Sequence, residues 1–138
     1  MGLFGGSKPG WDAAISFLTN TYKCEKVDNN SYKLLFGLPG GRDQIVIVAR
    51  DGNDSAGEWL SFSSPIGDLA DVGPRLPDLL RECSDTLCGG VVAFGETVVL
   101  RHSIPVTSFT PDSFTWALEA ITATADQFEE KFTGGNKY

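Results

Sequence analysis

His102 is the only histidine in the chain and is the first residue to consider for catalysis. A histidine can serve as a general base near neutral pH when a nucleophile lies beside it. The sequence contains no Gly-x-Ser-x-Gly elbow that would supply such a nucleophile. His102 alternates in phase with Val98, Leu100 and Ile104, which is the pattern of the buried side of a strand. We therefore interpret His102 as a core residue and expect no catalytic residues in this chain.

The three cysteines, Cys24, Cys83 and Cys88, could in number join His102 in a Cys₃His zinc site. Four residues separate Cys83 from Cys88 near an expected helix end, and this spacing does not suit paired zinc ligands. The odd number of cysteines also argues against a disulfide framework. We expect reduced thiols, with no metal, no disulfide and no cofactor.

Asp51, Asn53 and Ser55 have the spacing of the first three ligands of a calcium-binding loop. The glycine and the bidentate glutamate that such a loop requires are both replaced. The paired glycines elsewhere in the chain lack the phosphate-binding patterns as well. We interpret residues 51–57 as a seven-residue hairpin loop rather than as an ion site.

The charge balance restricts the class of partner. Lys and Arg total 11 against 18 Asp and Glu, which gives a formal net charge of −7. This charge repels phosphate backbones and anionic lipid surfaces, so we expect neither nucleic acid nor membrane as a partner. The sequence has no signal-peptide pattern and no apolar run of about 18 residues. Together with the cysteine content, these features predict a cytoplasmic protein.

A chain of 138 residues is long enough for one hydrophobic core and short for two. We expect a flexible leader over residues 1–10, a single domain over 11–133 and a flexible tail over 134–138. Hydrophobic periodicity predicts three helices, near 11–22, 75–87 and 111–132. Alternation and turn residues predict six strands, at 24–27, 32–38, 44–49, 58–64, 91–94 and 97–104, the last limited by Pro105.

These elements follow the order α-β-β-β-β-α-β-β-α, and hairpin turns rather than crossovers join the strands. The predicted fold is therefore α+β, an antiparallel sheet flanked by three helices. Residues 44–49 are apolar on both faces of the predicted strand, which predicts a central position in the sheet. The last helix carries seven apolar residues on one face and begins at a capping residue, Thr110.

A second stripe on the last helix is formed by Trp116, Ala120 and Ala123, at positions i, i+4 and i+7. This stripe points away from the sheet. Tryptophan supplies contact area and alanines let another backbone approach closely, so the stripe is a candidate protein-binding surface. The alternative is an ordinary exposed aromatic on an alanine-rich helix. Phe17 with Ala13 repeats the pattern in weaker form on the first helix.

The second half of the chain carries four recognisable patterns, which are Leu76-Pro77-Asp78-Leu79-Leu80, the hairpin Val91 to Ile104, the linker end Phe109-Thr110-Pro111 and the helix end Ala125-Asp126-Gln127-Phe128. In these residues the chain resembles the YbjN and type III secretion chaperone-like group of bacterial proteins, in which three helices flank a mostly antiparallel sheet. The resemblance implies chaperone-like protein binding without catalysis. It also implies a homodimer whose contacts lie around Leu79 to Phe94.

We favour a non-enzymatic protein-binding domain, chaperone-like or regulatory, that binds a protein partner and forms a homodimer. The candidate contact residues are Trp116, Ala120, Ala123, Phe17, Leu79 and Phe94. The alternative is a small-molecule-binding or enzymatic α+β domain. Its pocket would lie between sheet and helices, with His102 and Arg101 as its polar groups.

Overall fold

The computed structural model describes residues 10–87 and 89–135 of the chain. Within these ranges the chain forms one antiparallel sheet and helices that match the predicted α+β order, with the second helical segment divided in two. In chain order the elements are α1 (Trp11–Thr21), β1 (Cys24–Asp28), β2 (Ser31–Leu38), β3 (Arg42–Asn53), β4 (Gly57–Asp68), α2 (Leu69–Val72), α3 (Leu76–Glu82), β5 (Gly90–Phe94), β6 (Thr97–Pro105) and α4 (Pro111–Thr133).

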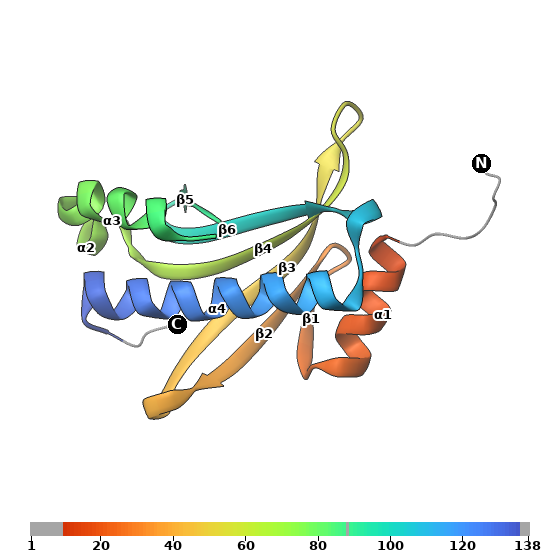
Figure 1. Ribbon diagram of the computed structural model, residues 1–138, viewed down its shortest axis with the longest axis horizontal. Helices are drawn as coiled ribbons and strands as arrows, with labels where there is room; N and C mark the ends of the chain where they lie inside the picture. The colour runs from red at the N-terminus through yellow and green to blue at the C-terminus, as the bar shows by residue number, and fades with distance from the viewer. Residues whose placement is uncertain (1–9, 88, 136–138) are drawn as a thin grey trace.

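The strands lie in the order β1-β2-β3-β4-β6-β5, and every neighbouring pair is antiparallel. The long helix α4 runs along one face of this sheet, with α1 beside its N-terminal end and α2 and α3 near its C-terminal end (Figure 1). The predicted central strand is β3, which lies between β2 and β4. We call the face that meets α4 the inner face and the opposite face the outer face.

The hairpin between β3 and β4 is longer than predicted, and the expected loop over residues 51–57 is wrong. Strand β3 continues to Asn53 and β4 begins at Gly57, so only a three-residue turn separates them. The Oδ1 atom of Asn53 accepts hydrogen bonds from the backbone N–H of Ser55 and Ala56, at 2.9 and 2.7 Å, and closes this turn. Gly52 has φ 123°, and a Cβ atom there would lie 1.9 Å from the backbone oxygen of Gly57, so only glycine fits.

The turn between β5 and β6 follows the predicted type II′ geometry. Gly95 has φ 59°, whereas no non-glycine residue of the described chain has a positive φ, which includes Glu96. A positive φ at the first central residue alone distinguishes type II′ from type I′. The turn therefore holds two residues and closes directly on the pair Phe94 and Thr97.

Helix α4 confirms the predicted amphipathic pattern. Its N-terminus is a capping box in which Thr110 accepts from the backbone N–H of Ser113, and the Ser113 hydroxyl accepts from that of Thr110. Its C-terminus ends at Gly134, which is left-handed with φ 72°. The seven predicted apolar residues are all buried, namely Phe114, Ala117, Leu118, Ile121, Ala125, Phe128 and Phe132.

The predicted helix over residues 75–87 is shorter and interrupted. Helix α2 ends at Val72, a 3₁₀ turn spans Gly73–Arg75, and α3 ends at Glu82 before a second 3₁₀ turn. Pro74 and Pro77 cause the interruption because neither carries a backbone N–H, and each occupies the first turn of its helical segment.

The last residue of the predicted leader and the first two residues of the predicted tail belong to the fold. Gly10 is buried and stands against Val106 of the linker before α4. The backbone oxygen of Gly135 accepts a 2.8 Å hydrogen bond from Arg42. The rest of both predicted flexible segments lies outside the described residues. No helix among residues 10–87 and 89–135 combines the length and the apolar character needed to cross a membrane.

Candidate functional site

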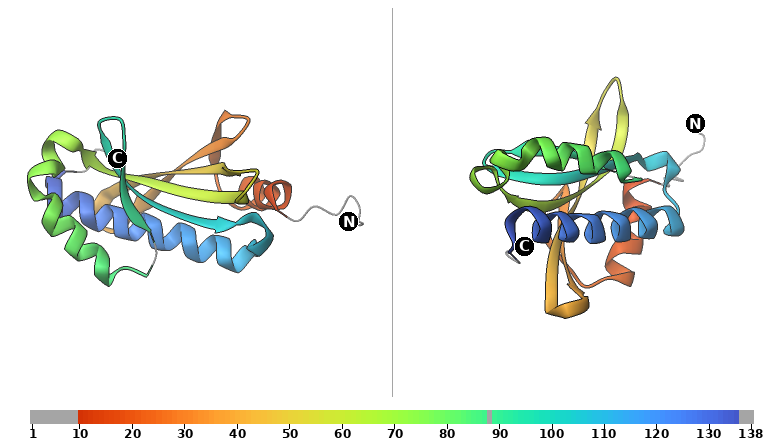
Figure 2. Two further views of the ribbon diagram at one scale, coloured as in Figure 1. Left: turned by 90° about the horizontal axis from the view of Figure 1, so that it is seen from above. Right: turned by 60° about the vertical axis from the view of Figure 1, so that its left-hand side comes forward.

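A hollow of about 450 Å³ opens on the outer face of the sheet. In the described part of the chain, no helix lies across this face (Figure 2, left). The turns β1–β2 and β5–β6 rise on this side of the sheet (Figure 2, left). The lining side chains come from four strands, and they are Ile47, Ala49, Asp51, Ser61, Ser63, Pro65, Phe94, Val99 and Arg101.

The strand register explains why a hollow forms here. Cross-strand partners share a face, and Ala49 lies opposite Ser61 while Ile47 lies opposite Ser63. The small side chains of Ala49, Ser61 and Ser63 therefore form a low floor in the middle of the sheet. Larger apolar side chains stand around this floor, and Phe94 on β5 is 51% exposed.

Arg101 and Asp51 form an ion pair at one end of the hollow. The Nε atom of Arg101 also donates to the Oγ atom of Ser61 at 3.3 Å. The guanidinium carbon lies 5.8 Å from the centre of the Phe94 ring, within the range of a cation–π contact. The charges of the hollow are thus paired with each other, and the remaining lining is largely apolar.

His102 lies on the inner face, away from this hollow. Its strand partner is Phe62, a core residue, whereas the partner of Arg101 is Ser63 on the outer face. The Nδ1 atom of His102 accepts a hydrogen bond from the backbone N–H of Gly89 at 3.2 Å. The predicted inner-face position of His102 is confirmed, but the side chain is half-buried rather than part of the core. The alternative pocket that used both His102 and Arg101 is not formed, because neighbouring residues of a strand point to opposite faces.

Burial lowers the pKa of His102 below its ordinary value of 6.5. The unfolded chain therefore takes up a proton near pH 6.5, while the folded protein resists protonation until a lower pH. Stability from this group is complete above about pH 6.5 and is lost as the pH falls through the lower folded value. We expect His102→Gln to lose less stability than the wild type between pH 7 and pH 5, as measured by urea unfolding at both values. Parallel losses in the two proteins would contradict this expectation.

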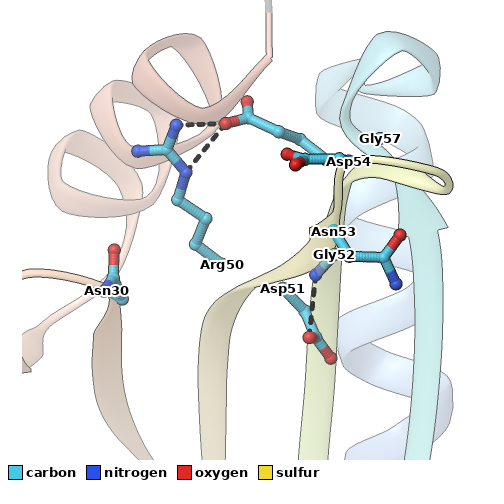
Figure 3. Close-up of a pocket in the computed structure, with 8 residues that line it drawn as sticks. Asn30, Arg50, Asp51, Gly52, Asn53, Asp54 and Gly57 are labelled. Atoms are coloured by element: carbon cyan, nitrogen blue, oxygen red, sulfur yellow. Dashed lines mark hydrogen bonds and ion pairs between the residues drawn. The ribbon is translucent and has the colours of Figure 1, made fainter.

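A second hollow, of about 530 Å³, lies beside the projecting end of the β3–β4 hairpin (Figure 3). Arg50 is held there by Glu58, with its Nε atom 3.0 Å from the carboxylate. Asp51 accepts from the backbone N–H of Gly52 at 2.8 Å, and the Asn53 side chain closes the turn. These contacts are those of a β-hairpin with a three-residue turn, so the predicted hairpin forms without the predicted seven-residue loop.

The two cysteines within the described residues are distant in the fold. Cys24 begins β1 and Cys83 follows α3, and both are free thiols. Burial, with a smaller contribution from the nearby Glu82 carboxylate, raises the pKa of Cys83, which makes its thiol less reactive near neutral pH. Residues 10–87 and 89–135 contain no cluster of three or more side chains suited to a metal. Cys88 lies outside these ranges.

The predicted contact residues differ in how exposed they are. Trp116 is 68% exposed on the side of α4 away from the sheet, as predicted, with Ala120 half-buried and Ala123 exposed. Phe17, in contrast, is an internal packing residue, because its ring meets that of Phe114 at a centroid distance of 5.5 Å.

Leu79 also differs from its prediction, since its side chain is fully buried in the core. The exposed residue of this pair is Leu80, at 53%, because consecutive residues of α3 face different directions. Of the contact residues predicted from the Leu79 to Phe94 region, Phe94 alone lies at the hollow.

Sequence reasoning missed the outer face as a site. The available signal was the run Ile45-Val46-Ile47-Val48, which is apolar toward both faces. On the inner face, Val46 and Val48 are fully buried under the helices. Ile45 and Ile47 point to the outer face, where their cross-strand neighbours belong to β2 and β4.

Sequence comparisons with known proteins suggest no function, so a functional proposal depends on the geometry described above. A scan against models of protein families finds no match, and a search of curated proteins finds no similar sequence.

Proposed function

We propose that this chain is a non-enzymatic, cytoplasmic protein-binding domain, chaperone-like or regulatory, that also associates with itself. The resemblance to the YbjN and type III secretion chaperone-like group motivates this proposal. The observation that carries it is the apolar character of the outer face of the sheet. A partner's apolar side chain would occupy the hollow around Phe94, Val99 and Ile47.

An antiparallel sheet that packs helices on one face usually presents polar residues on the other. Here the outward positions of β2, β3, β6 and β5 include Leu35, Ile45, Ile47, Val99 and Phe94, and β4 between them contributes Ser61, Ser63 and Pro65. Leu35 and Phe94 are 61% and 51% exposed. Exposed apolar side chains on an open sheet face are typical of protein-interaction sites.

The polar groups of the hollow support binding rather than catalysis. Asp51 and Arg101 neutralise each other, and His102 lies on the opposite face of the sheet. A catalytic site needs a nucleophile or base within hydrogen-bond distance of a reacting group. Serine hydroxyls on the floor of the hollow have no histidine beside them.

Exposed apolar residues favour the region around α3 and β5 for self-association. Among residues 10–87 and 89–135, the large hydrophobic side chains with high exposure are Val27, Leu35, Leu80, Leu87, Phe94 and Trp116. Half of these six lie between Leu80 and Phe94. On the exposed side of α4, Trp116 has alanines as its stripe neighbours, so it offers one large side chain rather than a surface.

Trp116→Ala and Phe94→Lys separate the two candidate surfaces. We expect Trp116→Ala to dimerise with an affinity close to that of the wild type, because its stripe makes no contact in the dimer. Phe94→Lys should weaken dimerisation by at least about tenfold, since it places a charge within an apolar contact. Light scattering over a concentration series measures both affinities. The opposite ranking of the two variants would move the interface to α4.

A pull-down from native lysate tests for a partner other than the chain itself. Wild-type protein and Ile47→Lys serve as matched baits, with partners identified by mass spectrometry. Ile47 lines the hollow and is half-buried, so circular dichroism must show that the variant folds. A partner retained by the wild type and lost with the folded variant supports binding at the outer face. Equal retention by both baits would exclude the hollow as its site.

A further inference from the structure

The two edge strands of the sheet differ in how they are protected. Strand β1 carries Glu25, Lys26 and Asp28, and charged residues of this kind prevent an edge from pairing with another chain. Strand β5 has the sequence Gly-Val-Val-Ala-Phe and carries neither a charge nor a proline. It packs along β6, and within the described residues no helix makes extensive contact with it. The β5 edge is therefore open to another strand.

The β5–β6 turn determines which backbone groups of β5 face outward. A two-residue turn closes on a hydrogen-bonded pair, which here is Phe94 and Thr97. Bonded and non-bonded pairs alternate along an antiparallel ladder, so the backbone groups of Val92 are directed toward β6. Those of Val91 and Ala93 are directed toward the free edge.

Symmetry restricts how a second copy could pair with this edge. Opposite residues of an antiparallel pair share a face, so a two-fold axis normal to the sheet must pass at a residue rather than between two. An axis at Val92 places Val91 opposite Ala93 of the other copy. All the outward N–H and C=O groups of both residues then form hydrogen bonds, in both copies. With the axis at Val91, the outward backbone groups of Ala93 lie opposite a residue beyond the end of β5. With the axis at Ala93, the same holds for the outward backbone groups of Val91.

The same register is complementary in side chains. With the axis at Val92, Phe94 of one copy lies opposite Gly90 of the other, on the outer face. An aromatic ring over a cross-strand glycine covers backbone that would otherwise be exposed. Gly90 is also the strand partner of Arg101, so the incoming ring would reach the guanidinium. Leu87, three residues before Gly90 in the sequence, is fully exposed.

We propose that two copies of this chain pair antiparallel along β5, with the two-fold axis at Val92, and so join their sheets into one. The occupant of the free edge is a second copy because the five-residue strand is complementary to itself in both backbone and side chains. This interface rests on the self-association proposed above and specifies where it occurs.

A cysteine at the axis gives a direct test. Residues of a non-hydrogen-bonded antiparallel pair have Cα atoms about 4.5 Å apart, which is within the range that a disulfide bridges. Val92→Cys should therefore convert most of the chain to a covalent dimer under mild oxidation, as seen on a non-reducing gel. The wild type and Val27→Cys, which places a thiol on the β1 edge, are the controls and should form little. No excess of covalent dimer in Val92→Cys would overturn the register.

Ala93→Pro blocks the edge without disturbing β6. The Ala93 N–H faces outward, and an edge strand tolerates proline at such a position. We expect Ala93→Pro to keep the circular dichroism of the wild type and to weaken dimerisation by at least about tenfold. Ala93→Ser retains the N–H and should dimerise like the wild type. Should Ala93→Pro fail to fold, the Val92→Cys crosslink alone decides.

The possible results distinguish the edge pairing from the self-association on which it rests. If the wild type and Ala93→Pro dimerise equally and Val92→Cys forms no crosslink, the edge pairing is wrong. Self-association is still supported in that case. A wild type that stays monomeric at high concentration overturns both. In neither case is partner binding at the hollow affected, because the pull-down with Ile47→Lys tests it separately.

Discussion

Replacing Arg42 with methionine should lower the free energy of unfolding by about 3–5 kcal/mol. Arg42 begins β3, and its Nε atom donates to Asp126 of α4 at 2.8 Å. Its Nη2 atom donates to the backbone oxygen of Gly135 at 2.8 Å and lies 3.7 Å from the Glu129 carboxylate. The Glu129 side chain is 1% exposed. Removing the guanidinium deprives a buried carboxylate of a nearby positive charge and releases the end of α4.

Urea unfolding measures this loss, and Arg50→Met is the matched control. Arg50 also pairs with a carboxylate, that of Glu58, but the two side chains are 42% and 46% exposed. Solvent screens such a pair, so its loss should cost less than about 1 kcal/mol. Similar costs at Arg42 and Arg50 would contradict the argument from burial. Combining Arg42→Met with Glu129→Met should recover part of the loss, because a buried ion pair is then replaced by apolar groups.

Phe114→Ala should lower the free energy of unfolding by about 3–5 kcal/mol. Its side chain is fully buried at the start of α4. Its ring centroid lies 5.5 Å from that of Phe17 on α1 and 5.2 Å from that of Phe62 on β4. A third ring, that of Phe109, lies 6.0 Å away. Truncation leaves a cavity where two helices meet the sheet, and the aromatic contacts are lost with it.

Thermal or urea unfolding of Phe114→Ala can be compared with that of Phe94→Ala. Phe94 is 51% exposed, so its truncation should change monomer stability by no more than about 1 kcal/mol. The comparison is made at a concentration where the wild type is monomeric, because dimerisation would add to apparent stability. A cost at Phe114 below that at Phe94 would show that the α1–α4 junction repacks around the gap.

Local signals in the sequence were sufficient for the elements whose own residues determine them. Helix α4 has a cap, a stop and a single apolar face, and its predicted bounds differ from the observed ones by one residue at the C-terminus. The β5–β6 turn depends on one glycine at its first central position. In both cases the deciding contacts lie within a few residues of each other.

Longer-range contacts determine the features that were missed. Residues 50–57 are polar and glycine-rich, which is typical of a loop, yet Arg50 pairs with Leu60 and Asp51 with Trp59 along the extended hairpin. Arg42 and Asp126 are far apart in the sequence and neither is unusual for its local pattern. In contrast, strand alternation alone places Arg101 and His102 on opposite faces of the sheet. The alternative hypothesis of a pocket that contains both side chains did not take this alternation into account.

The arrangement of the strands also bears on how the chain folds. In the part of the chain that the structure describes, four of the five neighbouring strand pairs are hairpins between consecutive strands. The fifth pair joins β4 to β6 across α2, α3 and β5. Hairpins close over short loops, so their entropic cost is small, whereas the β4–β6 ladder must close a longer loop. We expect this closure to limit the folding rate. Lengthening the chain between Glu82 and Gly89 should therefore slow folding more than it changes the equilibrium stability.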